Sequence, residues 1–268
     1  MFFRIENSKR KLDYENQLKK YIPTKIVYIV VNKGYKKCAK NLVKQQSNYD
    51  LMDANLNIMN HVLKNNYENI LILEDDFIFN DVLIESKILN EIKDFFNKNK
   101  NKNFYFKLGP VPNLFNIIPN KNIYKCIFTL SNQGVIYKKN LILDILNDKD
   151  IYIKNDNYIQ IDYYINKYSG YFYKIPLVFQ TFPKTENQKY WVGNNILLKI
   201  IELPNKYLNI DGSSNNYYVI KNGWYKMYNI YFFINYLLNI IVVIIILLIV
   251  YYLYKITMKK NKIMKRTK

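Results

Sequence analysis

The sequence is poor in the residues from which many metal and redox sites are built. Its 268 residues include two cysteines, Cys38 and Cys126, and one histidine, His61. Two cysteines offer neither the spacing of a metal site nor the density of a disulfide scaffold, so we expect free thiols, with a single disulfide as the alternative. His61 falls within an expected helix, where we interpret it as a packing or polar-face residue rather than a catalytic one.

We also expect no signal peptide, because the apolar residues 1–5 are followed at once by Glu6 and a run of charges. These first residues predict a strand. The long stretch 230–254 lacks charge altogether: its 25 residues, at about 1.5 Å each, exceed the roughly 30 Å hydrocarbon core of a membrane. Tyrosines at both ends suit the membrane interfaces, and Asn235 and Asn239 suit an associating or tilted helix. We predict a transmembrane helix, with a buried core helix as the alternative.

Two arguments about orientation in the membrane conflict. Seven basic residues follow the hydrophobic stretch, which favours a cytoplasmic tail and therefore a luminal domain. An amino-terminal domain without a signal peptide, whose only hydrophobic segment comes last, should instead stay cytosolic, as in tail-anchored proteins. We expect a single-pass membrane protein with a C-terminal anchor and a cytosolic domain.

The chain is basic, with a formal net charge of +19. Outside the last fourteen residues there are 33 basic and 21 acidic side chains, and the basic ones are spread along the whole chain. This distribution favours a solvated basic surface over a nucleic-acid groove, so we expect no nucleic-acid partner. A basic domain still favours anionic ligands such as nucleotide diphosphates or lipid phosphates.

The pattern of apolar residues predicts an α/β fold with a mostly parallel sheet flanked by helices. Residues 1–5, 8–21 and 24–31 read as strand, helix and strand, and such a unit implies parallel strands. We expect one domain over residues 1–193, a linker or juxtamembrane segment over 194–229, the transmembrane helix over 230–254 and a basic tail over 255–268. The remaining expected elements are helices at 50–65, 81–97 and 139–146, strands at 104–108 and 171–179, two short strands around a turn within 126–137, and irregular chain at 109–119.

One acidic motif interrupts this pattern. The stretch ILILEDDFIFN, residues 70–80, runs from a strand buried on both faces into Glu74, Asp75 and Asp76. Alternation along a strand would turn Glu74 and Asp76 to one face and Asp75 to the other. Ligands bind at the carboxyl ends of parallel strands, and hard oxygen donors suit Mg²⁺ or Mn²⁺ completed by phosphates and water. The alternative is an acidic surface turn.

Five segments in this order resemble the family 25 glycosyltransferases, which include lipooligosaccharide and collagen galactosyltransferases. The resemblance covers most of residues 1–188. The opening segment matches the first strand and a following arginine, here Arg10, and the acidic motif follows a helix of matching length. The segments are FFRIENSKR, ILILEDDF, FTLSNQGVIY, QIDYYI and PLVFQ.

The resemblance implies a GT-A fold, a nucleotide-sugar donor such as a UDP-sugar, and an Asp-x-Asp-type metal site with Mn²⁺ or Mg²⁺. Asp76 would bind the metal, and Glu74 would bind the metal or reach the donor ribose or a metal-bound water. Asp162 would be the base that deprotonates the acceptor hydroxyl in an inverting transfer. The acceptor would be a glycan, a lipid-linked molecule or a protein. The residues implied in donor binding are Glu74, Asp75, Arg10, Ser131 and Gln180, of which Ser131 and Gln180 could instead serve the acceptor.

The chain departs from the family at one place. Ala54-Asn55 stands where family members carry Ser-His, and neither residue accepts a proton as imidazole does. This departure motivates a second hypothesis, that of a catalytically inactive relative acting as a membrane-bound glycan-binding or scaffolding protein. A phosphatase or nuclease using the same carboxylates would need further Asp or His ligands for a two-metal site.

Overall fold

The computed structural model describes residues 2–5, 11–21, 24, 26–148, 161–180, 206–209 and 216–266. Its strands are β1 (Phe2–Ile5), β2 (Ile29–Asn32), β3 (Asn69–Leu73), β4 (Phe77–Phe79), β5 (Tyr105–Lys107), β6 (Val111–Phe115), β7 (Ile123–Leu130), β8 (Gly134–Lys138), β9 (Gly170–Tyr173) and β10 (Val178–Gln180). Its α-helices and short 3₁₀ helices (η) are α1 (Lys11–Tyr21), α2 (Ser47–Lys64), η1 (Asp81–Ile84), α3 (Ser86–Lys98), α4 (Lys139–Asn147), α6 (Ile161–Tyr164), η2 (Ile165–Lys167) and α8 (Tyr217–Arg266).

Eight of these strands form one mixed sheet in the order β2-β1-β3-β8-β5-β9-β7-β6. The first strand pairs in parallel with β2 and β3, which confirms the expected β-α-β unit. Beyond β3 the expectation of a mostly parallel sheet is wrong, because β8 runs antiparallel between β3 and β5, and β7 runs antiparallel to both β9 and β6. A strand can return antiparallel to its neighbour or cross over to lie parallel to it, and a strand buried on both faces is continuously apolar in either case. The α/β class is confirmed.

Two of the expected elements divide differently. The strand expected at 171–179 is interrupted before Pro176, and its second half, β10, pairs with β4 in a separate two-stranded sheet. The stretch 109–119, expected to be irregular because of its prolines, contains β6 with Pro112 inside it. This strand is the last in the sheet order, and an edge strand tolerates proline because one row of its N–H groups has no ladder partner.

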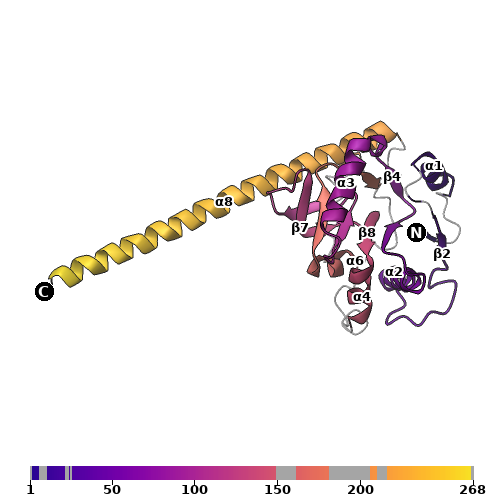
Figure 1. Cartoon of the computed structure of the whole chain (residues 1–268), viewed down its shortest axis with the longest axis horizontal. Helices are drawn as coiled ribbons and strands as arrows, with labels where there is room; N and C mark the ends of the chain where they lie inside the picture. Colours follow the sequence, from indigo (N-terminus) through magenta and orange to yellow (C-terminus); the bar gives the residue numbers. More distant parts are fainter. Residues whose placement is uncertain are drawn as a thin grey trace.

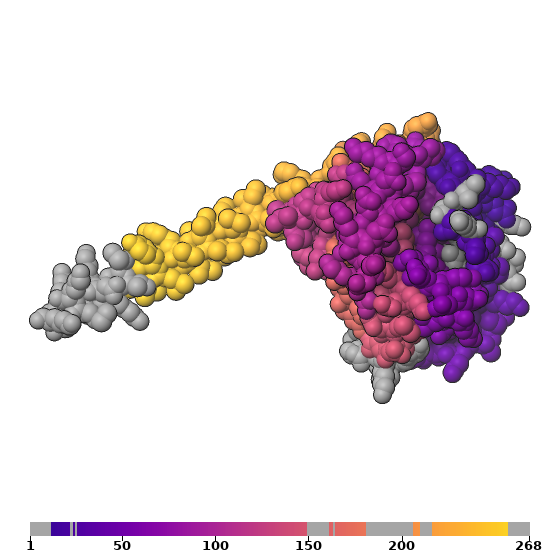
Figure 2. All heavy atoms as spheres, viewed as in Figure 1, coloured from indigo at the N-terminus to yellow at the C-terminus, as the bar shows by residue number. Residues whose placement is uncertain are grey.

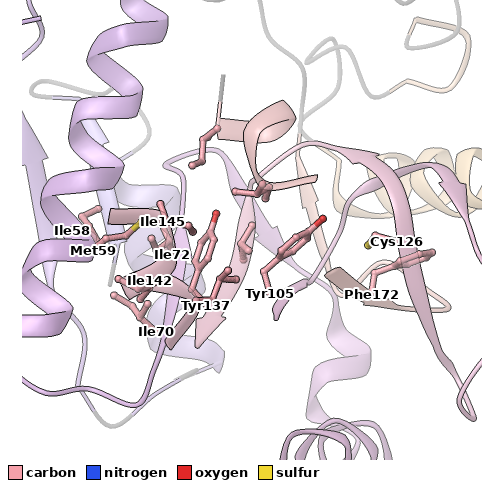
Figure 3. Packing of buried hydrophobic residues seen from close by; sticks show 14 of the residues in the cluster. Ile58, Met59, Ile70, Ile72, Tyr105, Cys126, Tyr137, Ile142, Ile145 and Phe172 are labelled. Atoms are coloured by element: carbon pink, nitrogen blue, oxygen red, sulfur yellow. The ribbon is translucent and has the colours of Figure 1, made fainter. Parts of the chain in front are cut away.

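The core has two layers, one on each face of the large sheet. Alternate residues of β3 face opposite layers, so Ile70 and Ile72 belong to one cluster and Leu73 to the other. Figure 3 shows Ile70 and Ile72 close to Ile58 and Met59 of α2, in the first layer. The expectation of a strand buried on both faces is confirmed. Both cysteines are free thiols, as expected.

The first part of the C-terminal helix α8 packs against the domain, and the rest projects away from the domain. Figure 1 shows the helix lying along the domain and then projecting away, and its yellow part stands clear of the other atoms in Figure 2. The sequence predicts a linker or juxtamembrane segment over residues 194–229, and within it residues 217–229 are helical and bury Trp224 completely. The glycine and asparagines of this region suggested a linker, but Ile220, Trp224, Met227 and Tyr228 follow the helical spacing of a buried stripe.

Asn235 joins α8 to the edge of the sheet. Its Oδ1 accepts a hydrogen bond from the Phe115 backbone N–H at 3.2 Å, and its Nδ2 donates to the Asn113 carbonyl at 3.1 Å. Both groups belong to the edge strand β6, whose outer backbone would otherwise be open to another chain. Asn235 is completely buried, so its role here is to complete the sheet edge as well as to continue the helix.

We predict that Asn235→Ala lowers the free energy of unfolding by about 1–3 kcal/mol, since one buried and one partly buried backbone group of β6 lose their partner. Chemical denaturation in detergent, followed by circular dichroism, measures the change. Asn239→Ala is the matched control, because Asn239 donates within the helix, to the Asn235 carbonyl. Equal losses in the two variants would contradict the role assigned to Asn235.

Candidate functional site

The three adjacent acids lie in a turn where β3 leaves the core. Leu73 is the last residue of the strand, Asp75 and Asp76 form the turn, and the Phe77 N–H donates to the Glu74 carbonyl at 3.4 Å. The position at the strand end agrees with the sequence-based expectation. The predicted strand alternation of the three side chains is wrong, because a turn and not extended chain holds them.

Asp76 is linked to two other residues implied by the family resemblance. Gln180 donates from Nε2 to Asp76 Oδ2 at 2.8 Å, and Ser131 donates from Oγ to Gln180 Oε1 at 3.0 Å. The three side chains come from the turn after β3, the turn after β7 and the end of β10. The fold therefore brings together residues that lie 49 and 104 positions apart in the chain.

Asp162 lies beside a buried lysine in the same region. Its Oδ1 is 3.9 Å from Lys107 Nζ, and the Ser131 backbone N–H lies near the carboxyl and acts to lower its pKa. Ser131 thus contacts Gln180 through its side chain and Asp162 through its backbone. Four of the residues named from the sequence, Asp76, Gln180, Ser131 and Asp162, form one connected set.

Lys107 was missed from the sequence. It is the last residue of β5, its side chain is completely buried, and its Nζ donates to the Thr129 carbonyl at 3.2 Å. A lysine within the apolar segment FYFKLGP, two positions before a glycine and a proline, was the available signal, because lysine is rarely fully buried unless it is paired.

Burial disfavours the charged forms of both members of this pair. It raises the pKa of the Asp162 carboxyl, while the Lys107 ammonium and the Ser131 N–H act in the opposite direction. Burial also lowers the pKa of Lys107, which the charges of Asp162, Cys126 and Glu74 partly offset. Asp162 keeps 27% of its side-chain surface exposed, so solvent or a ligand can reach it. A carboxylate with a raised pKa and open access is a candidate proton acceptor.

Two segments hold the four connected residues in place: residues 131–133, between β7 and β8, and the segment around Gly109, after β5. Gln133, completely buried, donates from its side-chain amide to the Gly109 carbonyl and accepts from the Ser131 hydroxyl, while its own carbonyl accepts from the Glu74 N–H at 3.4 Å. Ser131 has a φ of 73°, a left-handed conformation that costs a non-glycine residue on the order of 1 kcal/mol or more. Such strain persists where the surroundings fix the backbone, and functional sites are a common place for it.

The C-terminal helix α8 also contacts the site. Trp224 of α8 donates its indole N–H to the Gln180 carbonyl at 2.7 Å. Gln180 bonds to Asp76 and Ser131 through its side chain, and α8 therefore holds the same residue through its backbone carbonyl. The sequence pattern of residues 194–229 does not predict this contact.

Other residues named from the sequence lie elsewhere. Arg10 falls outside the described residues. Asn55 is buried in α2 and donates to the Leu51 carbonyl at 2.9 Å, one turn back in its own helix. His61 packs near the rings of Tyr28 and Tyr67, at 5.3 and 6.2 Å between centroids, as expected of a packing residue. Asp75 occupies the middle of the acidic turn.

Within the described residues no group of three or more His, Cys, Asp or Glu side chains is placed to hold a metal ion. Glu74 and Asp76 supply carboxylate oxygens from one turn. Mg²⁺ in proteins is commonly held by one or two carboxylates together with phosphate oxygens and water. The donor chemistry fits a divalent cation that is shared with a phosphate ligand, and it does not fit a complete protein cage.

No protein-family model and no curated protein matches this chain. Among solved structures, A197 from STIV is similar with a TM-score of 0.38 and 10% sequence identity, over 66% of this chain and 82% of that one. An apo UDP-glucose pyrophosphorylase is similar with a TM-score of 0.30 and 11% identity, over 63% of this chain and 66% of that one. Likeness at this level carries no argument about function.

We predict that Gly109→Ala destabilises the protein by about 1–3 kcal/mol, as overpacking does. A Cβ at this position would lie 1.8 Å from the Val178 carbonyl oxygen, so the backbone that leads to Gln180 must move. Gly34→Ala is the control, since a Cβ there meets only Asp50 Oδ2 at 3.8 Å. Denaturant unfolding compares the two. A stability in Gly109→Ala as high as in Gly34→Ala would show that the approach of β10 to Gly109 is not fixed.

Proposed function

We propose that the protein is a membrane-anchored, metal-dependent glycosyltransferase with a GT-A-like fold. It moves a hexose, such as galactose, from a nucleotide-sugar donor to a glycan, lipid-linked or protein acceptor, with inversion at the sugar carbon. The observation that carries the proposal is the connected set of Asp76, Gln180, Ser131 and Asp162. It combines a carboxylate beside a strand end with a second, accessible carboxylate whose pKa is raised.

On the donor side, Asp76 and Glu74 are the proposed ligands of Mn²⁺ or Mg²⁺. When bound, the cation neutralises the negative charge that grows on the departing diphosphate. Gln180 orients the Asp76 carboxylate through its bond to Oδ2. Ser131, Asp75 and Arg10 remain proposed donor-binding residues.

On the acceptor side, Asp162 is the proposed base. As the bond between the sugar carbon and the diphosphate breaks, the acceptor oxygen forms a bond to that carbon and its proton passes to Asp162. A raised pKa makes the carboxylate a better proton acceptor near neutral pH. Lys107 acts as a positioning residue, because its ammonium lies beside the base and opposes the effect of burial on it.

Asn132 is the residue we propose to bind sugar hydroxyls. It follows Ser131 directly, is 8% exposed, and neither its Oδ1 nor its Nδ2 has a hydrogen-bond partner among the described residues. An amide that stays unpaired in the protein interior is costly. A bound sugar offers both donors and acceptors, so the ligand could supply the missing bonds.

A second candidate function is that of a catalytically inactive relative which binds glycans at the membrane. The observation in its favour is the Ala54-Asn55 departure, since the Asn55 amide is bonded within α2. In both candidates α8 serves as the anchor, because it is long and apolar enough to cross a membrane. A cytosolic domain remains our expectation for the orientation.

We predict Mn²⁺-dependent hydrolysis or transfer from at least one nucleotide sugar in a panel of donors. Asp76→Asn should lower the rate by about 100-fold or more, as loss of an electrostatic contact to the transition state does. Asp94→Asn, on the exposed face of α3, is the control and should keep the full rate. If no donor is turned over and Asp76→Asn binds each donor as the unchanged protein does, the inactive relative is the better account.

We predict that kcat/KM rises with pH as Asp162 loses its proton, with a midpoint above the ordinary carboxyl value of 3.8. Lys107→Met should move this midpoint to higher pH, because the ammonium that lowers the Asp162 pKa is gone. Asp162→Asn should remove this limb of the profile and lower the rate by about 10²–10⁴-fold. The pH profiles of the three proteins measure the shift; an unchanged midpoint in Lys107→Met would contradict the pairing.

A further inference from the structure

We propose that the β6–β7 hairpin, residues 111–130, is a second membrane contact. It lies in the surface layer of the bilayer that α8 enters, and a groove between hairpin and helix takes the acyl chain of a phospholipid. This inference rests on the proposed anchoring by α8 and is independent of the proposed chemistry. The inference is supported by the residues that line the groove, by their depth in the bilayer and by the charge of the hairpin.

The groove has a volume of about 390 Å³ and lies where α8 leaves the domain. Its apolar walls come from Leu114 and Ile127 of the hairpin and from Leu238 and Val242 of α8. Lys125 and Asn239 also line it. The apolar walls suit the acyl chain of a phospholipid, and the Lys125 ammonium suits the phosphate of the same lipid.

The hairpin exposes apolar side chains beside the helix. Ile127 is 54% exposed and Ile118, near the tip, is 77% exposed. Single exposed apolar residues are ordinary, but Ile127 lines the groove together with Leu238 and Val242 and so continues their apolar surface. A continuous exposed apolar patch marks an interaction site.

Bilayer thickness places this patch at the membrane. At about 1.5 Å per residue, a helix needs about 20 residues to cross a hydrocarbon core of roughly 30 Å. Lys255 is the first charge after the apolar stretch, and counting about 20 residues back from it reaches the region of Asn235. Leu238 and Val242 then lie at the near edge of the hydrocarbon. Leu114 and Ile127 line the same groove and reach the same depth.

The charge of the hairpin suits the bilayer surface. Residues 111–130 include Lys121 and Lys125 and contain no acidic residue. Basic side chains next to a membrane-inserted helix attract anionic headgroups, and a lysine can lay its apolar stem along lipid while its ammonium stays in the headgroup layer.

The groove is separate from the candidate catalytic site. Trp224, which contacts Gln180, precedes Leu238 by 14 residues, about 21 Å along the helix. The groove therefore does not hold the acceptor; it gives the domain a second point of attachment. One helix alone would let the domain rotate about it, whereas helix and hairpin together fix the side of the domain that faces the lipid.

Spin labels on the full chain in phosphatidylcholine vesicles test this inference. Each label is attached to a cysteine introduced into a Cys38→Ser background, in which the remaining Cys126 is buried. The three positions are Ile118 on the hairpin, Ile246 in α8, and Leu12 on α1, which lies at the opposite end of the domain in Figure 1. Collision with oxygen, which concentrates in lipid, is compared with collision with a water-soluble nickel complex.

We expect oxygen to dominate for the labels at Ile118 and Ile246, and the nickel complex to dominate for the label at Leu12. If Ile246 reports lipid while Ile118 behaves like Leu12, the hairpin contact is overturned and the anchor stands. If Ile246 reports water, the anchor and the hairpin contact both fail. The chemistry assigned to Asp76 and Asp162 is tested by the donor assays and is not affected by either result.

The role of Lys125 is tested with vesicles that also contain phosphatidylserine. Lys125→Glu should shift the label at Ile118 toward water, because it places a carboxylate next to anionic headgroups. Lys19→Glu, an exposed position on α1, makes the same change in charge and should leave the label where it was. If both variants behave alike, Lys125 does not contact the headgroup.

Discussion

The side chain and backbone of Gln180 connect the parts of this protein that its proposed function needs. Its amide donates to Asp76 in the acidic turn, its Oε1 accepts from Ser131, and its backbone carbonyl accepts from Trp224 of α8. Through Ser131 the same set reaches Asp162. A displacement of Gln180 would therefore disturb the donor side, the acceptor side and the helix that leads to the membrane at the same time.

A buried charge pair completes the site. Lys107 and Asp162 lie 3.9 Å apart, and burial disfavours the charged form of each. A pair of this kind stabilises a fold little, because the loss of hydration offsets much of the attraction. In the proposed mechanism its value lies instead in the base Asp162, whose pKa is raised by burial and which lies near the ends of β5 and β7. The left-handed backbone of Ser131 is a second feature of this site that lowers the stability of the fold.

Local patterns in the sequence predicted most of the described helices and strands, whereas the pairings between distant segments could not be predicted from them. The βαβ unit, the helices over α2 and α4 and the position of the three acids at the end of β3 follow from apolar spacing near each residue, whereas the turn that holds the acids was not predicted. The antiparallel course of β8 and the edge position of Pro112 depend on partners far along the chain. The family resemblance indicated Asp76, Ser131, Gln180 and Asp162, but their mutual contacts, the buried Lys107 and the contact from Trp224 needed the fold.

The central claim is that Asp76 and Asp162 flank a bound nucleotide sugar. A crystal structure of the protein with Mn²⁺ and each of several nucleotide sugars tests it most directly. We predict a cation on Asp76 that also contacts the diphosphate, with Asp162 facing the sugar carbon from the side opposite the leaving group. A diphosphate bound away from Asp76, or a sugar carbon turned away from Asp162, would contradict the account.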